Sequence, residues 1–241
     1  MQVYFPDNES VLQSSMLVAW KQSRAVYNFR SLPETAVICV DDAVMKAFRT
    51  FRARTIKGIK GRHFVQQGIL FSSSFDNGGA GILNLLEELH ALGVQRFVFV
   101  GLAGRLVPGI AEGSCFSVSK AISGTGVTRY YHPGEETAPF NEPFLQDMSS
   151  SLNIGSCTCF STDAPFRETR QLLQQCVARG ATLIEMECAA VYAFSHFYRV
   201  GAACLLIAAD TLTPEWQSPA DFPALLRKQS ELIRGLIKFL A

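Results

Sequence analysis

The stretch "TLIEMECAAVYAFSHFYRVGAACLLIAAD", from Thr182 to Asp210, decides the fold class of this chain. It is typical of a short strand ("TLIEM"), a buried helix ("ECAAVYAFSHFYRVG") and a second, apolar strand ("AACLLIAAD"). Acids stand near both ends of this apolar run, and a buried charge is costly unless it has a partner. We therefore expect Glu185, Glu187 and Asp210 to be exposed to solvent, paired with another group or part of a functional site.

The same alternation of strands and helices continues through the rest of the chain. "TAVICV", "RFVFVGLAG" and "GSCFSVSKAI" favour strands, and we expect "GLAG" to form a glycine turn at the end of its strand. "AGILNLLEELHALG", "RETRQLLQQCVARGA" and "SPADFPALLRKQSELIRGLIKFLA" have the apolar spacing of helices. This order predicts an α/β fold, with a central mixed, mostly parallel twisted sheet flanked by helices. We predict one domain over residues 1–241, with residues 1–34 assigned only as an N-terminal extension.

Composition excludes several classes of partner. The chain has 241 residues, of which 48% are hydrophobic, enough for a large core. Its net charge is +1 and its lysines and arginines look scattered, so neither nucleic acid nor a membrane is an expected partner. No apolar run reaches the roughly 18 residues that a membrane span needs. The N-terminal "MQVYFPDNESVLQ" is too acidic and polar for a signal peptide, and a cytoplasmic location is predicted.

The seven cysteines favour a reducing compartment over a disulfide framework. Their number is odd, and most lie in apolar segments, where cysteine behaves as a small hydrophobic residue. "SCTC" holds Cys157 and Cys159 in a C-x-C pattern, but no second ligand pair accompanies it. We predict no metal and no organic cofactor.

Ligands of open α/β sheets bind outside the carboxyl ends of the strands. Three strand ends qualify here: "GLAG" after Val100, "IEME" after Leu183 and "AAD" after Ile207. These ends carry the glycines and acids that call for an explanation.

Three segments resemble one known family. "GLAGRLVPGIAEGSCFSV", "FSTDAPFRETR" and "IEMECAAVYAFSHFYRVGAACLLIAAD" are similar to the nucleoside phosphorylases and nucleosidases, from about Val37 to the C-terminus. The resemblance implies a homotrimer or homohexamer that cleaves the N-glycosidic bond of a small-molecule purine or pyrimidine nucleoside with phosphate. A phosphate-independent nucleosidase and a non-catalytic nucleoside-binding relative are the alternatives.

The resemblance also gives roles to the "IEME" residues. Glu187 would accept hydrogen bonds from the ribose hydroxyls, Met186 would pack on the sugar, and Glu185 belongs to the same ribose-binding element. An ionised carboxylate accepts hydrogen bonds only and suits two adjacent hydroxyl donors. The alternative is a glutamate at a helix N-terminus, where the macrodipole favours negative charge.

Base recognition would come from two other segments. In purine-specific relatives the counterpart of Asp210 acts as general acid toward N7 of the base. The alternative for Asp210 is an N-cap that opens "DTLTPEW". Phe166 resembles the position that stacks on the base, with Arg167 and Glu168 beside it, although "RETR" also fits a solvated first helical turn. The chain has both an acid and an arginine here, so the base class stays open.

Further contacts are expected from loops and backbone. Thr128 and Arg129, in "GTGVTRYYH", resemble a loop that helps to cover base and sugar. Glycine-rich backbone offers N–H groups to phosphate or sugar, and we expect such contacts from Gly101, Leu102, Ala103, Gly104, Gly78 and Gly79.

The phosphate ligands of the family are not recognisable in this chain. Phe99 replaces the strand arginine and Leu102 replaces a hydroxyl residue. In "CVDDAVMKAF", Asp41 and Asp42 would repel an anion, while Lys46, Arg49 and Arg105 do not match the family's cation positions. Kinship makes phosphate the expected co-substrate. Water is the alternative, and either Asp41 or Asp42 would then orient it.

Overall fold

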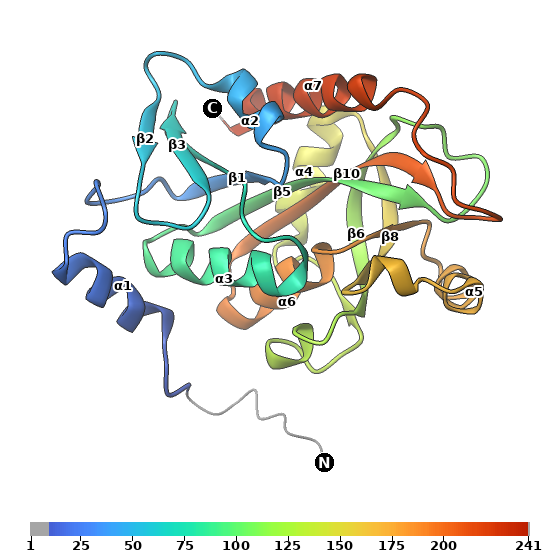
Figure 1. Cartoon of the computed structure of the whole chain (residues 1–241), viewed down its shortest axis with the longest axis horizontal. Helices are drawn as coiled ribbons and strands as arrows, with labels where there is room; N and C mark the ends of the chain where they lie inside the picture. Colours follow the sequence, from blue (N-terminus) through green and yellow to red (C-terminus); the bar gives the residue numbers. More distant parts are fainter. Residues whose placement is uncertain (1–9, 241) are drawn as a thin grey trace.

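The computed structural model describes residues 10–240, which form one mixed sheet covered by helices (Figure 1). The sheet has ten strands in the order β10-β6-β8-β9-β5-β1-β4-β3-β2, with β7 paired to β6. The strands are β1 (Thr35–Cys39), β2 (Arg54–Ile56), β3 (Arg62–Gln66), β4 (Ile69–Ser73), β5 (Arg96–Arg105), β6 (Cys115–Gly124), β7 (Glu136–Thr137), β8 (Gly155–Thr162), β9 (Leu183–Glu185) and β10 (Gly201–Thr211).

The centre of the sheet is parallel. β1 pairs with β4 on one side and β5 on the other, and β5 also pairs with β10, all in parallel register. Every residue of β1 and β4 is buried, as expected for strands covered on both faces. β3 and β2 extend the sheet in antiparallel pairing.

The pairings among five of the strands form a closed ring. β10 pairs with β6 as well as β5, β6 pairs with β8, β8 with β9, and β9 returns to β5. The carboxyl ends of β5, β9 and β10 are therefore held together by hydrogen bonds. The acids at the ends of β9 and β10 owe their position to this ring.

The helices cover both faces of the sheet. α3 (Gly78–Ala91) and α6 (Cys188–Tyr198) pack over one hydrophobic core, and α2 (Asp42–Phe48), α4 (Glu142–Leu152) and α7 (Phe222–Leu240) pack over a second. Figure 1 shows α2 and α7 above the sheet and α3 and α6 below it. α5 (Arg170–Ala178) covers a third, smaller core, and α1 (Ser14–Ser23) packs on α3.

The predicted fold class is confirmed, with one local correction. The expected glycine turn at "GLAG" is wrong, because β5 continues through Gly101 and Gly104 to Arg105. A Cβ on Gly104 would lie 2.1 Å from Cδ1 of Leu212, so this glycine serves close packing inside a strand. The helices α1 and α2 and the strand β2 were not predicted. Residues 1–9 of the N-terminal extension lie outside the described residues.

Within residues 10–240, none of the helices combines the length and the apolar character that a bilayer crossing requires.

Candidate active site

Two cavities lie near the joined ends of β5, β9 and β10. The first, the acidic cavity, has a volume of about 290 Å³. It is lined by Val40, Asp41, Asn77, Phe99, Val100, Gly101, Leu102, Glu185, Met186, Glu187 and Gln229. Three of these side chains are carboxylates, and none is a lysine or arginine.

Glu187 is a buried carboxyl group in the wall of the acidic cavity, only 7% exposed. Its Oε1 accepts a hydrogen bond of 2.7 Å from the backbone N–H of Gly78, at the start of α3. Gly78 has φ = +81°, a conformation that favours glycine. Burial, and after it the charge of Glu185, raises the pKa of Glu187 to about 7. The group therefore changes charge near neutral pH.

Glu185 has a different set of partners from Glu187. Its Oε2 accepts hydrogen bonds of 2.6 Å from the N–H of Glu187 and 2.8 Å from the N–H of Cys188, which opens α6. Its Oε1 accepts from the hydroxyl of Ser161. Glu185 thus satisfies backbone donors at the helix start, as the macrodipole alternative anticipated for one of the two glutamates. The neighbouring side chain of Met186 is half-buried and also lines the cavity.

Asp41 and Gln229 complete the polar lining of the acidic cavity. Asp41 is the N-cap of α2, with Oδ1 accepting from the N–H of Ala43 at 2.7 Å and of Val44 at 3.1 Å. Gln229, on α7, is 2% exposed and donates through Nε2 to the carbonyl oxygen of Val100 at 3.4 Å. Its Oε1 is buried with no hydrogen-bond partner, an uncommon state for a polar atom.

The second cavity, the tryptophan cavity, has a volume of about 650 Å³. It is lined by Pro165, Phe166, Glu168, Arg170, Leu173, Asp210, Leu212, Pro214, Glu215 and Trp216. Asp210 lies within β10, so it is not the N-cap of a following helix. Its Oδ2 accepts a 2.9 Å hydrogen bond from Nε1 of Trp216.

Glu168 adds a second carboxyl group to the tryptophan cavity. Burial, followed by the charge of Asp210, raises the pKa of Glu168 to about 7. Phe166 is 98% exposed, and its ring is free to cover a ligand in this cavity. Arg167 is also exposed but is not part of the cavity lining.

The glycine segment of β5 links the two cavities. Gly101 and Leu102 line the acidic cavity, whereas a Cβ on Gly104 would lie 3.3 Å from Oδ1 of Asp210. Three residues of extended strand cover roughly 10 Å. Glu187 and Asp210 therefore line separate cavities, each of which lies close to the C-terminal half of β5. Ala103, between them, is buried in the core.

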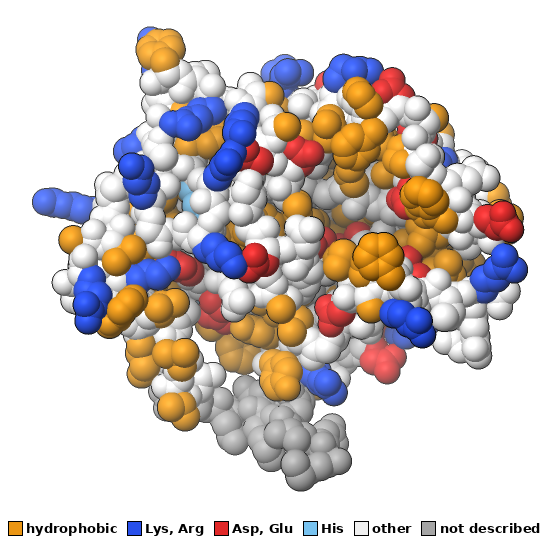
Figure 2. Space-filling view, in the orientation of Figure 1, with side chains coloured by type: hydrophobic (Ala, Val, Ile, Leu, Met, Phe, Trp, Pro, Cys, Tyr) orange, Lys and Arg blue, Asp and Glu red, His pale blue; other side chains and the backbone are white. Residues whose placement is uncertain are grey.

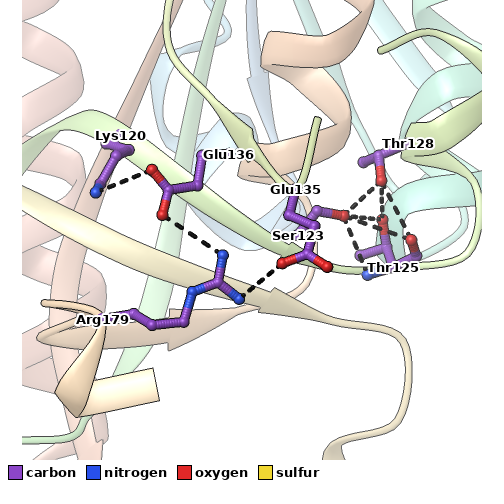
Figure 3. Close-up of polar contacts among 7 residues, drawn as sticks. All are labelled: Lys120, Ser123, Thr125, Thr128, Glu135, Glu136 and Arg179. Atoms are coloured by element: carbon purple, nitrogen blue, oxygen red, sulfur yellow. Dashed lines mark hydrogen bonds and ion pairs between the residues drawn. The ribbon is translucent and has the colours of Figure 1, made fainter. Parts of the chain in front are cut away.

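The loop residues Thr128, drawn in Figure 3, and Arg129 both form hydrogen bonds close to their own loop. The hydroxyl of Thr128 is buried, bonds to that of Ser123 and donates to the carbonyl oxygen of Thr125 at 3.2 Å. Arg129 donates from Nε to the carbonyl oxygen of Gly126 at 3.0 Å. Neither side chain lines the acidic or the tryptophan cavity.

The other predicted anion contacts also have partners within the chain. The N–H of Gly78 donates to the carboxyl group of Glu187. Gly79 is packed so closely that an added Cβ would lie 2.9 Å from Cγ2 of Val127. Arg105 donates from Nε to the carbonyl oxygen of Asp210 at 3.3 Å and from Nη1 to that of Ile110 at 3.2 Å. Lys46 lies 2.6 Å from Asp42. None of these cations reaches the acidic cavity.

Cys159, Glu185 and Cys188 bring possible metal ligands close together in the described part of the chain. Their chemistry fits a hydrogen-bond network better than a metal site. Burial raises the pKa of the Cys159 thiol to about 12 and that of Cys188 well above its ordinary value, and a metal binds thiolates. Both oxygens of Glu185 already accept hydrogen bonds.

Sequence reasoning missed Trp216 and Gln229. Trp216 stands six residues after Asp210 in the polar run "DTLTPEWQ", and its loop is folded back by a bridge between Thr211 and Gln217. Gln229 stands on the apolar face of an amphipathic helix, between buried Leu225 and Leu232. A polar residue on the apolar face of a predicted helix can be recognised from the sequence alone, so this pattern could have pointed to Gln229.

Comparison with known proteins identifies the family. The family model of the phosphorylase superfamily matches residues 42–238, and the chain belongs to this superfamily of nucleoside-cleaving enzymes. A protein of Acanthamoeba polyphaga mimivirus is 23% identical over 135 residues. That alignment covers 56% of this chain and 54% of the viral protein, so the chain spans about half the length of that relative.

Two solved structures share the fold. The purine nucleoside phosphorylase of Toxoplasma gondii, in complex with immucillin-H, superposes with a TM-score of 0.71 at 16% identity. The superposition covers 85% of this chain and 90% of the phosphorylase chain. The AMP nucleosidase of Bacteroides thetaiotaomicron gives a TM-score of 0.68 at 16% identity. This superposition covers 92% of this chain and 99% of the nucleosidase chain. One neighbour is a phosphorylase and the other a nucleosidase, and both have this α/β architecture.

Proposed function

We propose that this protein is a nucleosidase that uses water to cleave the N-glycosidic bond of a nucleoside or a close analogue. Membership of the phosphorylase superfamily supports glycosidic cleavage. The observation that favours water is the lining of the acidic cavity, in which three carboxylates and no cation face the space beside the glycines of β5.

Electrostatics argues against phosphate in this cavity. A phosphate dianion close to two or three carboxylates would be repelled by each, and partial burial weakens the screening by water. The side chains of Phe99 and Leu102, in the same wall, carry no hydrogen-bonding group. Water needs only an acceptor that orients it. Asp41 offers such an acceptor in the lining.

The proposed division of work follows the two cavities. Glu187 and Met186 hold the ribose in the acidic cavity, and Glu185 keeps the start of α6 in place behind them. Developing positive charge at C1′ in an oxocarbenium-like transition state would be stabilised by nearby carboxylates. Asp210 donates a proton to the departing base in the tryptophan cavity, where Phe166 and Trp216 supply aromatic surface. Glu168 contributes a second group for base recognition.

Further features are proposed on kinship alone: assembly as a homotrimer or homohexamer, a cytoplasmic location, and activity without an organic cofactor or metal.

Release of free base from a panel of purine and pyrimidine nucleosides, with and without phosphate, tests the proposal. We expect base release at the same rate in phosphate-free buffer and formation of the free sugar. Glu215→Gln, a neutralised acid elsewhere in the tryptophan cavity, is the control for Asp210→Asn. Release that requires phosphate, with formation of the sugar 1-phosphate, would establish a phosphorylase. Saturable binding without release would leave a nucleoside-binding protein.

A further inference from the structure

A third cavity, the basic cavity, lies between α2 and the β2–β3 hairpin and has a volume of about 460 Å³. Four cationic side chains line it: Lys46, Arg49, Lys57 and Arg62. Asp42 is the one acid in the lining. Four of the 22 lysines and arginines of this chain, which look scattered in sequence, therefore meet at one hollow of the fold.

The surrounding segment strengthens the positive charge. Residues 43–75 contain seven cations and no acid: Lys46, Arg49, Arg52, Arg54, Lys57, Lys60 and Arg62. Figure 2 shows blue side chains gathered over the part of the surface where Figure 1 places α2, β2 and β3. Like charges crowded in one hollow repel each other, and an anion between them removes that cost.

The cations of the basic cavity are only partly neutralised. Lys46 and Arg62 both pair with Asp42, so two positive charges share one carboxylate. Arg49 donates to the hydroxyl of Thr55, which is neutral. Lys57 has no ion-pair partner among the residues that the structure describes. Arg49 and Lys57, which directly follow α2 and β2, thus line the hollow without a carboxylate partner.

The basic cavity also adjoins the acidic cavity. Asp41 lines the acidic cavity and caps α2, while the next residue, Asp42, lines the basic cavity. Consecutive Cα atoms lie about 3.8 Å apart. The first turn of α2 therefore forms a wall between the two hollows.

We propose that the basic cavity binds a small polyphosphate anion, either free pyrophosphate or the polyphosphate group of a nucleotide. Arg49 and Lys57 supply the uncompensated charge, and Lys46 and Arg62 exchange part of their contact with Asp42 for the ligand. Multiply charged oxyanions suit this arrangement because several cations from different elements can reach one ligand. The inference rests on the basic cavity alone and does not depend on glycosidic cleavage.

Calorimetric titration of the full chain with pyrophosphate and with ATP tests this site, and adenosine serves as the uncharged probe. We expect one pyrophosphate or ATP per chain, with an affinity that falls as salt rises. Thermal unfolding should shift upward with either anion. Pyrophosphate binding alone identifies a free anion as ligand; tighter binding of ATP identifies a nucleotide.

The double variant Arg49→Gln/Lys57→Gln should weaken pyrophosphate binding roughly tenfold or more, since charge-assisted hydrogen bonds are lost. Arg96→Gln/Arg199→Gln removes the same charge from exposed positions outside the basic cavity and should change the affinity less than about twofold. Equal weakening in both double variants, or no binding of either anion, would overturn the proposal. Base release from nucleosides, measured on the same samples, reports on the proposed nucleosidase separately.

Discussion

The indole N–H of Trp216 donates a 2.9 Å hydrogen bond to Oδ2 of Asp210, and both side chains line the tryptophan cavity. Trp216 is 66% exposed, so this contact is made at the surface of the molecule. A base that enters the cavity meets the carboxylate and the indole together.

Trp216 should therefore report nucleoside binding through its fluorescence. The chain has two tryptophans, and Trp20→Phe leaves Trp216 as the one emitter. We expect a saturable change of emission with nucleoside in Trp20→Phe and none in Trp216→Phe. Trp216→Phe should also slow base release, roughly tenfold, because the hydrogen bond that positions the carboxyl group of Asp210 is lost. An unchanged emission in Trp20→Phe at saturating nucleoside would remove the indole from the site.

Asp210→Asn should separate turnover from binding. General acid catalysis contributes about 10²- to 10⁴-fold, and an amide cannot supply the proton. We expect base release to fall by at least about 100-fold while nucleoside affinity, measured by calorimetry, changes less than about fivefold. Glu215→Gln is the matched control in the same cavity. If Asp210→Asn keeps full activity, the proton comes from another group.

Nucleoside affinity should rise with pH around neutrality. Glu187 accepts hydroxyl hydrogen bonds as a carboxylate, and its pKa is raised to about 7. Below that pH the affinity should fall by up to about tenfold per pH unit. Binding isotherms between about pH 5.5 and 8.5 measure the slope. Glu187→Gln should flatten this slope and weaken binding, whereas Glu168→Gln, which removes the second carboxyl group whose pKa is raised to about 7, tests whether the slope belongs to Glu187.

The same two carboxyls predict how stability changes with pH. The pKa of Glu187 and that of Glu168 are raised from 4.5 to about 7 in the folded chain, so the folded state binds more protons than the unfolded state between these values. The free energy of unfolding should therefore fall as pH rises from about 4.5 to 7, and level off above. Urea unfolding at several pH values measures this change. For Glu187→Gln we expect a shallower fall and a gain of roughly 1–3 kcal/mol at pH 8. A gain that is equally large at pH 4 would mean that ionisation is not its cause.

Gly104→Ala should damage both stability and activity. The added Cβ would lie 2.1 Å from Leu212 and 3.1 Å from Ile184, and overpacking of this kind costs about 1–3 kcal/mol. Oδ1 of Asp210 would lie 3.3 Å from the same Cβ, so the added methyl group also crowds the proposed general acid. Gly155→Ala, where the nearest atom would be 3.4 Å away, should be close to neutral. Denaturant unfolding compares the two variants, and equal stabilities would contradict the packing role.

Local signals in the sequence predicted the fold class, and they also predicted that Glu185 and Asp210 stand at the ends of strands. The apolar runs of β5 and β10 and the "IEME" element are continuous in sequence, so their strand and helix character could be recognised. The different hydrogen-bond partners of Glu185 and Glu187 could not be predicted in this way. They include Gly78 and Ser161, which lie 109 and 24 residues away and meet the two carboxyls only in the folded chain.

Other features depend on contacts that have no local pattern. The glycines of "GLAG" suggest a turn, but β5 continues through Gly104, which lies close to Leu212 and Asp210. The seven cations of residues 43–75 alternate with apolar residues and suggest a solvated surface. Folding of α2 onto the β2–β3 hairpin is what places four of them around one hollow.

The closed arrangement of β5, β10, β6, β8 and β9 also bears on self-association. A ring has no terminal strand, so within the described residues one edge of the sheet is the two-residue β7, which pairs with β6, and the other edge is β2. That strand is three residues long and carries Arg54, and short, charged edges discourage the addition of strands from other molecules. Copies of this chain should therefore associate through helices and loops, and the native protein should resist β-sheet aggregation even at high concentration.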